Sequence, residues 1–201
     1  MPRLLLWCKR LMDLVGASLV LILLSPVLIV AALAVKIQDG GPILYRRRCV
    51  GCHGEYDAFK LRSMRVDADR YLEDHPELKA EFQQNYKLND DPRTTPVGAF
   101  LRKTSIDELP QLINVLRGEM SLVGPRMITR PELEKYGDKS GALLTVKPGM
   151  TGYWQVAGRQ EVGYGDRVEM DMYYIKHWSL GLDFQILFKT PWKVLKREGA
   201  L

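Results

Sequence analysis

The chain has 201 residues, of which 46% are hydrophobic and 26% are charged. These values are ordinary for a globular protein and exclude a disordered or fibrous chain. Subtracting 24 acidic from 29 basic side chains leaves a net charge of +5, which favours anionic partners such as phosphorylated metabolites, acidic lipid headgroups or nucleic acid. Three cysteines cannot build a disulfide framework, and three histidines argue against a large metal cluster.

A long apolar segment lies near the N-terminus. Leu14 to Val35 gives 22 residues without a charge, which predicts a helix. Such a helix is about 33 Å long, enough to cross the hydrocarbon core of a membrane. Three interpretations fit: a spanning helix, a cleaved signal peptide with a small-x-small cleavage site at 32–34, and a re-entrant helix that enters and leaves on the same side.

Two features favour a re-entrant helix over residues 1–37. Pro26 interrupts the apolar run and removes a backbone hydrogen bond, which the neighbouring Ser25 hydroxyl is placed to replace. Basic residues flank both ends of the segment, whereas a spanning helix normally has them on one side. They are Arg3, Lys9 and Arg10 before the segment, and Lys36, Arg46, Arg47 and Arg48 after it.

Asp13 stands at the start of this segment, just after Lys9 and Arg10. It either interacts with the helix dipole or forms an ion pair that pins the hairpin at the level of the lipid headgroups. Both interpretations stay open from the sequence.

The rest of the chain predicts a small, mostly helical α+β unit. Short strands at 43–45 and 56–61, joined through Gly51 and Gly54, predict a β-hairpin. Residues 65–88 have helical spacing that Pro76 breaks.

The C-terminal third alternates aromatic and basic residues. This pattern is typical of amphipathic helices lying in a membrane interface, and a helix that covers a protein core fits it equally well. The residues are Trp178, Phe184, Phe188 and Trp192 with Lys189, Lys193, Lys196 and Arg197.

A capping-box pattern spans Ser105 to Glu108 and predicts the start of a helix that Gly118 ends. Asp107 and Glu108 either cap this helix or carry chemistry. A helix N-terminus attracts anions, and the neighbouring residues Arg102, Lys103 and Arg126 add positive charge. A carboxylate beside such a phosphate pocket could bind Mg²⁺ or attack phosphorus.

Further basic residues follow the second strand and a later turn. Lys60, Arg62, Arg65 and Arg159 are each ordinary surface residues when taken alone. Together with Arg126 they could neutralise a nucleotide diphosphate. A Walker A loop is absent from the sequence, which excludes a P-loop enzyme.

Residues Cys49 to His53 form a C-x-x-C-H sequence, which is the haem-attachment pattern of c-type cytochromes. Combined with a signal peptide, it describes an exported haem protein with Met64 as a distal ligand. The pattern is short and also occurs by chance in turns.

Longer strings connect these motifs to a known family, and they run in order from residue 9 to about residue 190. They include Lys9-Arg10-Leu11-Met12-Asp13, Ser25-Pro26, Gly41-Pro42-Ile43, Phe59-Lys60-Leu61-Arg62-Ser63-Met64, Asp91-Pro92-Arg93, Leu101 to Leu112, Ser121 to Arg126, Lys147 to Gly152, Gln155 to Arg159, Asp171 to Tyr174 and Trp178-Ser179-Leu180. On these strings the chain resembles the bacterial sugar transferases, the monotopic phosphoglycosyl transferases that start polyprenol-linked glycan assembly.

This resemblance implies a fold and a location. It implies a monotopic membrane protein with a re-entrant helix over 1–37, carrying Lys9, Arg10, Asp13, Ser25 and Pro26. It also implies a catalytic domain over 38–201 on the cytoplasmic face of the bacterial inner membrane, with membrane phospholipids as partners and a homodimer as a possible assembly.

The resemblance also implies a reaction. Sugar-1-phosphate would move from a UDP-sugar to a polyprenol phosphate such as undecaprenyl phosphate, with release of UMP. Asp107 would be the covalent nucleophile, and Asp107 and Glu108 would hold Mg²⁺. Substrate-binding positions would be Lys60, Arg62, Arg102, Arg126, Arg159 and Asp171. The helical region 67–88 resembles the branch that transfers hexose-1-phosphates, which suggests UDP-galactose or UDP-glucose.

Two other functional hypotheses are also consistent with the sequence motifs. The exported haem protein predicts covalent haem and loss of residues 1–34. A membrane-tethered basic protein that binds nucleic acid or acidic lipid predicts binding that weakens with salt. The modest net charge and the lack of a basic-aromatic module argue against nucleic acid as a partner.

Overall fold

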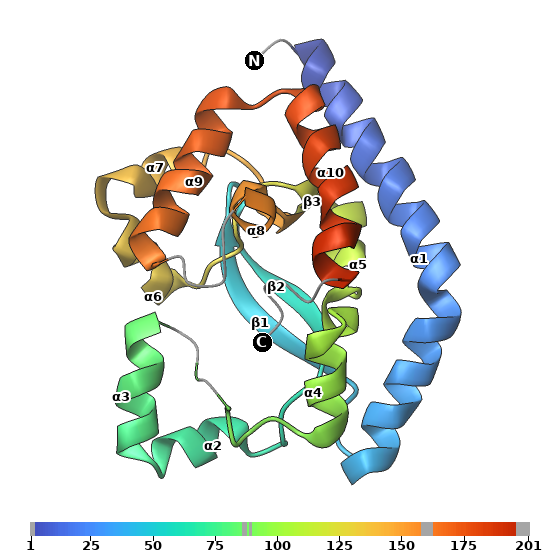
Figure 1. Ribbon diagram of the computed structural model, residues 1–201, viewed down its shortest axis with the longest axis vertical. Helices are drawn as coiled ribbons and strands as arrows, with labels where there is room; N and C mark the ends of the chain where they lie inside the picture. The colour runs from blue at the N-terminus through green and yellow to red at the C-terminus, as the bar shows by residue number, and fades with distance from the viewer. Residues whose placement is uncertain (1–2, 86–87, 89, 158–162, 196–201) are drawn as a thin grey trace.

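The computed structural model describes residues 3–85, 88, 90–157 and 163–195. These residues form a mostly helical α+β structure, as expected, with two small sheets at its centre (Figure 1). The strands are β1 (Leu44–Gly51), β2 (Gly54–Leu61), β3 (Ser121–Val123) and β4 (Gly149–Thr151). The helices are α1 (Arg3–Asp39), α2 (Ala68–Glu73), α3 (Pro76–Asn85), α4 (Pro96–Lys103), η1 (Ile106–Glu108), α5 (Gln111–Arg117), α6 (Arg130–Leu133), η2 (Glu134–Lys139), α7 (Ser140–Leu143), α8 (Tyr153–Ala157), α9 (Tyr164–His177) and α10 (Leu180–Leu195).

The hairpin of β1 and β2 is confirmed, and its strands are longer than predicted. The register pairs Leu44 with Leu61 at one end and Gly51 with Gly54 at the other. Gly54 has a φ of 101°, a conformation that glycine adopts without strain, so the chain reverses within two residues. Successive residues face opposite sides of this ribbon, which places Arg47 and Lys60 on the same side.

Helix α1 is long and apolar enough to cross a membrane by length and composition, and most of its apolar side chains are exposed. The helix continues through Pro26 without a break and curves gently along one side of the molecule (Figure 1). Pro26 lacks the N–H that would bond the Ile22 carbonyl. The Ser25 hydroxyl donates to that carbonyl at 2.8 Å, which confirms the predicted local repair.

The N-terminal part of α1 is held to the rest of the protein by polar contacts. Lys9 Nζ donates to Asp183 at 2.8 Å, and Arg10 donates to the Val115 and Leu116 carbonyls at the end of α5. Asp13 is 2% exposed and accepts hydrogen bonds from residues 121 and 122 of β3. The prediction that Asp13 pins the helix by an ion pair is therefore wrong. It docks α1 onto a strand edge, and the ion pair belongs to Lys9.

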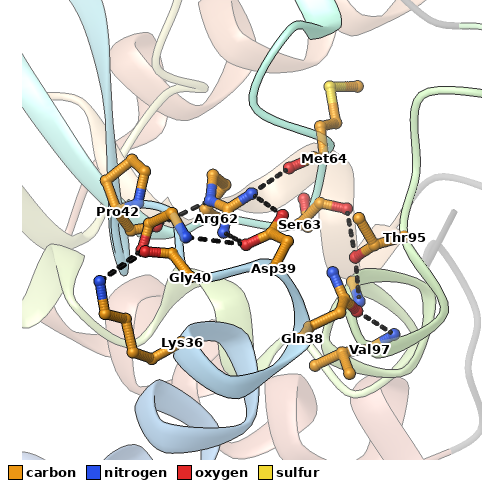
Figure 2. A network of polar contacts seen from close by, with 12 residues as sticks. Lys36, Gln38, Asp39, Gly40, Pro42, Arg62, Ser63, Met64, Thr95 and Val97 are labelled. Carbon is orange, nitrogen blue, oxygen red and sulfur yellow. Dashed lines mark hydrogen bonds and ion pairs between the residues drawn. The ribbon is translucent and has the colours of Figure 1, made fainter.

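The C-terminal end of α1 is fastened to the same folded unit (Figure 2). The guanidinium of Arg62 forms two ionic hydrogen bonds with Asp39, and its Nε donates to the Pro42 carbonyl at 2.7 Å. Gln38 accepts a hydrogen bond from the backbone of Val97 at the start of α4. Both ends of α1 thus contact the domain formed by the rest of the chain.

The polar region after β2 follows the pattern expected from the sequence. Pro76 begins α3, so the polar region after β2 consists of two short helices. The main core lies between the hairpin, α5, β3 and α8–α10, where Leu112, Val115 and Ile186 are almost completely buried.

The last helix, α10, carries an exposed aromatic face. Phe184, Phe188 and Trp192 project from it, and Phe188 is 81% exposed. Trp178, grouped with them in the sequence, instead donates through Nε1 to Asp183 at 3.0 Å. Lys196 and Arg197 lie outside the described residues.

Candidate active site

Asp107 and Glu108 lie in η1, a single 3-10 turn between α4 and α5. The predicted capping box is absent: Ser105 has a φ of 56° and makes no side-chain cap. The helix that ends at Gly118 begins only at Gln111, so the acidic pair precedes it and does not form its first turn.

Pro110 explains this interruption. A helix running from residue 106 would need an N–H at position 110 to bond the carbonyl of Ile106, and proline has none. The turn closes instead with the shorter bonds from Glu108 N to Ser105 O and from Leu109 N to Ile106 O, both 3.2 Å. The sequence pattern identified the acidic pair, and the proline four residues after Ile106 was the signal against a continuous helix.

Asp107 is buried, with 6% of its surface exposed. Burial raises its pKa to about 6, and the neighbouring negative charge of Glu108 acts in the same direction. Lys60 and Arg102 partly offset this effect. At neutral pH the carboxylate is therefore mostly ionised but poorly hydrated, a state that makes it a better nucleophile.

Glu108 is held in its ionised form by cations. Burial works to raise its pKa, but the charge and hydrogen bond of Lys60, together with Arg126 and Arg47, outweigh it and lower the pKa below its usual value. Lys60 Nζ lies 2.5 Å from Glu108 Oε1. The two neighbouring carboxyls therefore have opposite pKa shifts, which is a frequent property of catalytic acid pairs.

Arg126 approaches this pair from the loop after β3. A side chain at Gly124 would come within 2.5 Å of the Lys147 carbonyl, so only glycine lets this loop pack against the segment before β4. The backbone N–H of Arg126 points toward the carboxylate of Asp171, at 3.3 and 3.4 Å from its two oxygens. The guanidinium lies 5.2 Å from the ring centre of Trp154.

Asp171 supports this loop from behind. Its carboxylate is completely buried, and it accepts a hydrogen bond from the Tyr136 hydroxyl at 2.8 Å as well as the contact from Arg126. Burial raises its pKa to about 6. The structure thus places Asp171 in the interior, where it positions Arg126, and its predicted contact with substrate stays a prediction.

Arg102 lies at the end of α4, beside the acidic pair. It donates to the Ser63 hydroxyl at 2.8 Å and to the Thr94 hydroxyl at 3.2 Å, and its charge acts on Asp107. Two neutral acceptors orient this guanidinium without cancelling its charge.

Arg62 does not join this group. Its donors are used by Asp39 and by the Pro42 and Met64 carbonyls at the C-terminal end of α1 (Figure 2). Arg62 therefore has a structural role, and its predicted contact with substrate stays a prediction. Asp39 lies 23 positions before Arg62 in the chain, and no local sequence pattern indicates that the two residues pair. Arg159 lies outside the described residues.

Three residues of this region were missed by the sequence analysis: Arg47, Trp154 and Arg167. Arg47 pairs with the buried Glu132 at 2.9 Å, and its charge acts on Glu108. Strand alternation gave a usable signal, since Arg47 shares a face of the hairpin with Lys60. Arg167 lies 4.9 Å from the ring centre of Trp154. It stands one helical turn before Asp171, and that spacing also predicts a shared face.

The haem hypothesis finds no support at Cys49. This thiol is 1% exposed in the core beside Tyr56, and burial raises its pKa to about 11. It faces the protein interior and not a cofactor.

The residues in this cluster fit a phosphate-handling site. Two adjacent carboxylates stand within a group of cations drawn from the hairpin, α4 and the β3 loop, namely Lys60, Arg47, Arg102 and Arg126. Within the described residues no set of three or more acidic, histidine or cysteine side chains gathers to hold a metal by itself. A Mg²⁺ ion that binds two carboxylates and completes its shell with substrate phosphates and water is compatible with this donor set.

Comparison with known proteins identifies the family of the chain. Residues 4–197 match the bacterial sugar transferase family, and the chain belongs to it. It is 48% identical over 96% of its length to the undecaprenyl-phosphate galactose phosphotransferase of Salmonella typhimurium, and 43% identical over 96% to the UDP-glucose:undecaprenyl-phosphate glucose-1-phosphate transferase of Escherichia coli. It is 45% identical to the exopolysaccharide production protein ExoY of Sinorhizobium fredii, with 96% of this chain and 87% of that protein aligned. The alignment covers only 41% of the Salmonella and E. coli proteins, so the chain spans about two fifths of their length.

Proposed function

We propose that the protein transfers a sugar-1-phosphate from a UDP-sugar to undecaprenyl phosphate and releases UMP. The observation that carries this proposal is the buried Asp107 beside the ionised Glu108, both facing several cations. Membership of the sugar transferase family and the activities that the names of two relatives state support the same chemistry. The reaction would be the first membrane step of surface glycan assembly.

Asp107 is the nucleophile in this proposal. A carboxylate oxygen of Asp107 attacks the β-phosphorus of the UDP-sugar, and the bond from that phosphorus to the bridging oxygen breaks. UMP leaves with the bridging oxygen, and the sugar phosphate remains on Asp107 as an acyl phosphate. An oxygen of undecaprenyl phosphate then attacks the same phosphorus, and Asp107 leaves as a free carboxylate.

The cations make this attack feasible. A negative carboxylate and a negative diphosphate repel each other, so positive charge must screen the phosphate oxygens. Lys60 holds Glu108 at 2.5 Å, and Arg102 and Arg126 approach from two other elements. Glu108 remains ionised in this setting, which suits it to bind a metal or to position the acceptor.

We propose Mg²⁺ as the cofactor, held by Asp107 and Glu108 together with substrate phosphate oxygens. When bound, it would neutralise phosphate charge as the new bond forms. Removal of divalent metal with EDTA should abolish UMP release, and added Mg²⁺ should restore it. UMP release that continues unchanged in EDTA would contradict this assignment.

The donor is proposed to be UDP-galactose or UDP-glucose. The names of the Salmonella and E. coli relatives state galactose and glucose, respectively. The helical insertion α2–α3, which the sequence analysis linked to hexose donors, is present.

Two labels in one donor test the reaction. Purified protein in detergent would receive undecaprenyl phosphate, Mg²⁺ and UDP-galactose or UDP-glucose, with one label in the sugar and another in the β-phosphate. Both labels should move together into lipid extracted by organic solvent, with UMP in the water phase. Movement of the sugar label alone, with release of UDP, would show a simple glycosyl transferase instead.

We also propose that α1 is a membrane-associated helix whose two ends both lie on the cytoplasmic side, and that the catalytic domain lies on the cytoplasmic face of the inner membrane. Contacts at both ends of α1 support this, since Lys9 and Asp13 bind one part of the folded unit and Asp39 binds another. A spanning helix would place these two ends on opposite sides of the membrane, although both contact the same folded unit. The outward apolar side of α1 and the aromatic face of α10 would both contact phospholipid.

Thiol labelling tests this topology. In a variant with Cys8, Cys49 and Cys52 replaced, single cysteines would be placed at the exposed positions Arg3 and Glu77 (R3C or E77C). An impermeant maleimide should label both in inverted membrane vesicles and neither in intact spheroplasts. Labelling of R3C only from the outer face would mean that α1 spans the membrane.

A further inference from the structure

Arg126 and Arg167 lie against the same aromatic ring. Their guanidinium carbons are 5.2 and 4.9 Å from the centre of the Trp154 ring, on α8. Arg126 comes from the loop after β3 and Arg167 from the first turn of α9. Arg126, Arg167 and Trp154 thus come from three separate elements, and two positive charges meet at one aromatic ring.

These two charges are unbalanced, in contrast to their neighbours. Lys60 pairs with Glu108, and Arg47 pairs with Glu132. Among the residues that the structure describes, neither Arg126 nor Arg167 has an ion pair. Two like charges held together without an ion pair repel each other, and the nearby Glu108 and Glu132 already pair with other cations, so the arrangement favours a bound anion.

Two buried donors lie at the same place. Within the described part of the chain, Arg167 Nε and Trp154 Nε1 are both buried and have no hydrogen-bond partner. A buried donor without an acceptor destabilises the fold unless a ligand supplies one. Burial and the charge of Arg126 lower the pKa of Arg167, which shows how poorly this environment suits an uncompensated cation.

The helix that carries Arg167 also carries Asp171, one turn later on the same face. Asp171 holds the backbone of Arg126, so α9 fixes both arginines relative to each other. The charge of Arg126 also acts on Glu108, which connects the pair to the acidic residues.

We propose that Arg167, Arg126 and Trp154 form a phosphate-binding subsite next to Asp107 and Glu108, with Arg167 as a substrate-binding residue. This inference rests on the proposed function, because it assigns the subsite to a substrate of that reaction. The shared chemistry is a phosphate group with several acceptor oxygens, which suits paired guanidiniums. It belongs either to the diphosphate of the donor or to the phosphate of the polyprenol.

Steady-state kinetics of Arg167→Gln tests the subsite. Loss of an ionic hydrogen bond to phosphate should lower kcat/KM by roughly 10- to 100-fold for the substrate concerned. A fall for the UDP-sugar alone would assign the subsite to the donor, and a fall for undecaprenyl phosphate alone would assign it to the acceptor. Arg167→Lys, which keeps the charge but loses the planar fork, should recover part of the loss.

Arg130→Gln provides the matched control. The Arg130 side chain is 74% exposed and pairs with Glu55 on the β-hairpin, so the kcat/KM of this variant should remain that of the wild type. Calorimetric titration with UDP and with farnesyl phosphate measures binding apart from turnover. In one of these titrations Arg167→Gln should bind at least about tenfold more weakly.

Unchanged kcat/KM for both substrates, together with unchanged binding of both probes, would overturn the subsite. Equal losses in Arg167→Gln and Arg167→Lys, accompanied by a lower melting temperature, would also overturn it, because they indicate a structural role. Failure of the proposed function would look different: the wild type itself would release no UMP. The two calorimetric titrations would then still decide whether Arg167 binds phosphate.

Discussion

Asp107 and Asp171 are both buried and have similar pKa values, but their surroundings give them different roles. Burial raises the pKa of both Asp107 and Asp171 to about 6. Asp107 lies beside Lys60 and Glu108 and is free to react, whereas Asp171 is occupied by Tyr136 and the backbone of Arg126. A shifted pKa alone therefore does not identify a catalytic group, and the hydrogen-bond partners decide.

Asp171 should make stability depend on pH. Its pKa is near 3.8 in the unfolded chain and about 6 in the folded protein, so the folded state binds the proton more tightly. The stabilisation is complete below about pH 4 and is lost as the pH rises through about 6. Between these limits the unfolding free energy of the wild type should fall by about 3 kcal/mol relative to Asp171→Asn.

Denaturation of both proteins at pH 4 and at pH 7.5 measures this difference. Because the two proteins differ at one residue, the difference between their unfolding free energies excludes the contributions of all other titrating groups. A difference between them that stays constant across this range would contradict the assignment.

Asp13 is the residue on which docking of α1 depends most directly. Asp13→Ala would leave the Ser121 hydroxyl and the Leu122 N–H buried without an acceptor. The expected loss of stability is about 2–4 kcal/mol. Thermal melting should fall by about 5–10 °C, and Asp74→Ala, at a carboxylate that is 65% exposed, should leave it unchanged. An unchanged melting temperature in Asp13→Ala would mean that α1 is held by other contacts.

At the scale of elements, α4 depends on close packing at one glycine. A Cβ at Gly98 would lie 1.9 Å from the Ser63 carbonyl oxygen, so backbone must move to accept it. Gly98→Ala should cost about 3 kcal/mol and also weaken catalysis, because α4 carries Arg102 toward Asp107.

Gly141→Ala is the matched control for this substitution. Gly141 lies in α7, and a Cβ there meets nothing within 4 Å. Its alanine variant should be as stable as the wild type or slightly more stable. Thermal melting and UMP release of both variants decide the question, and equal stability of Gly98→Ala and Gly141→Ala would contradict the packing of α4 against the end of β2.

Local signals predicted several elements correctly. Gly51 and Gly54 mark the hairpin turn, Pro76 separates α2 from α3, and Ser25 repairs the backbone lesion at Pro26. Each depends on residues within a few positions of one another. The helix break at Pro110 also had a local signal, the proline itself. The sequence analysis missed this break because it gave the capping-box pattern more weight.

Contacts between distant residues could not be predicted in this way. Asp13 and Ser121 are 108 positions apart, and Arg62 contacts Asp39 across the whole β1–β2 hairpin, 23 positions earlier in the chain. The sequence proposed that the acidic pair, Lys60 and Arg126 share a phosphate site, and the structure brings these residues together, but their spacing alone could not show that they converge. The family resemblance assigned no site role to Arg47 or Arg167, and these two residues were identified from the folded structure.

At the scale of the whole molecule, α1 organises the protein. It runs along one side, in contact with β3 and α5 near its N-terminal part and with β2 and α4 near its C-terminal part (Figure 1). Its remaining apolar side chains face outward, as does the aromatic face of α10. A membrane bound on these surfaces would hold the acidic pair within reach of both a soluble donor and a lipid acceptor.

The most direct measurement is UMP release from UDP-galactose and UDP-glucose with undecaprenyl phosphate and Mg²⁺, comparing the wild type with Asp107→Asn. Asp138→Asn, at an exposed carboxylate in η2, is the matched control. The wild type and the control should release UMP, and Asp107→Asn should be at least about a thousandfold slower. UMP release by Asp107→Asn at the wild-type rate would contradict Asp107 as the nucleophile.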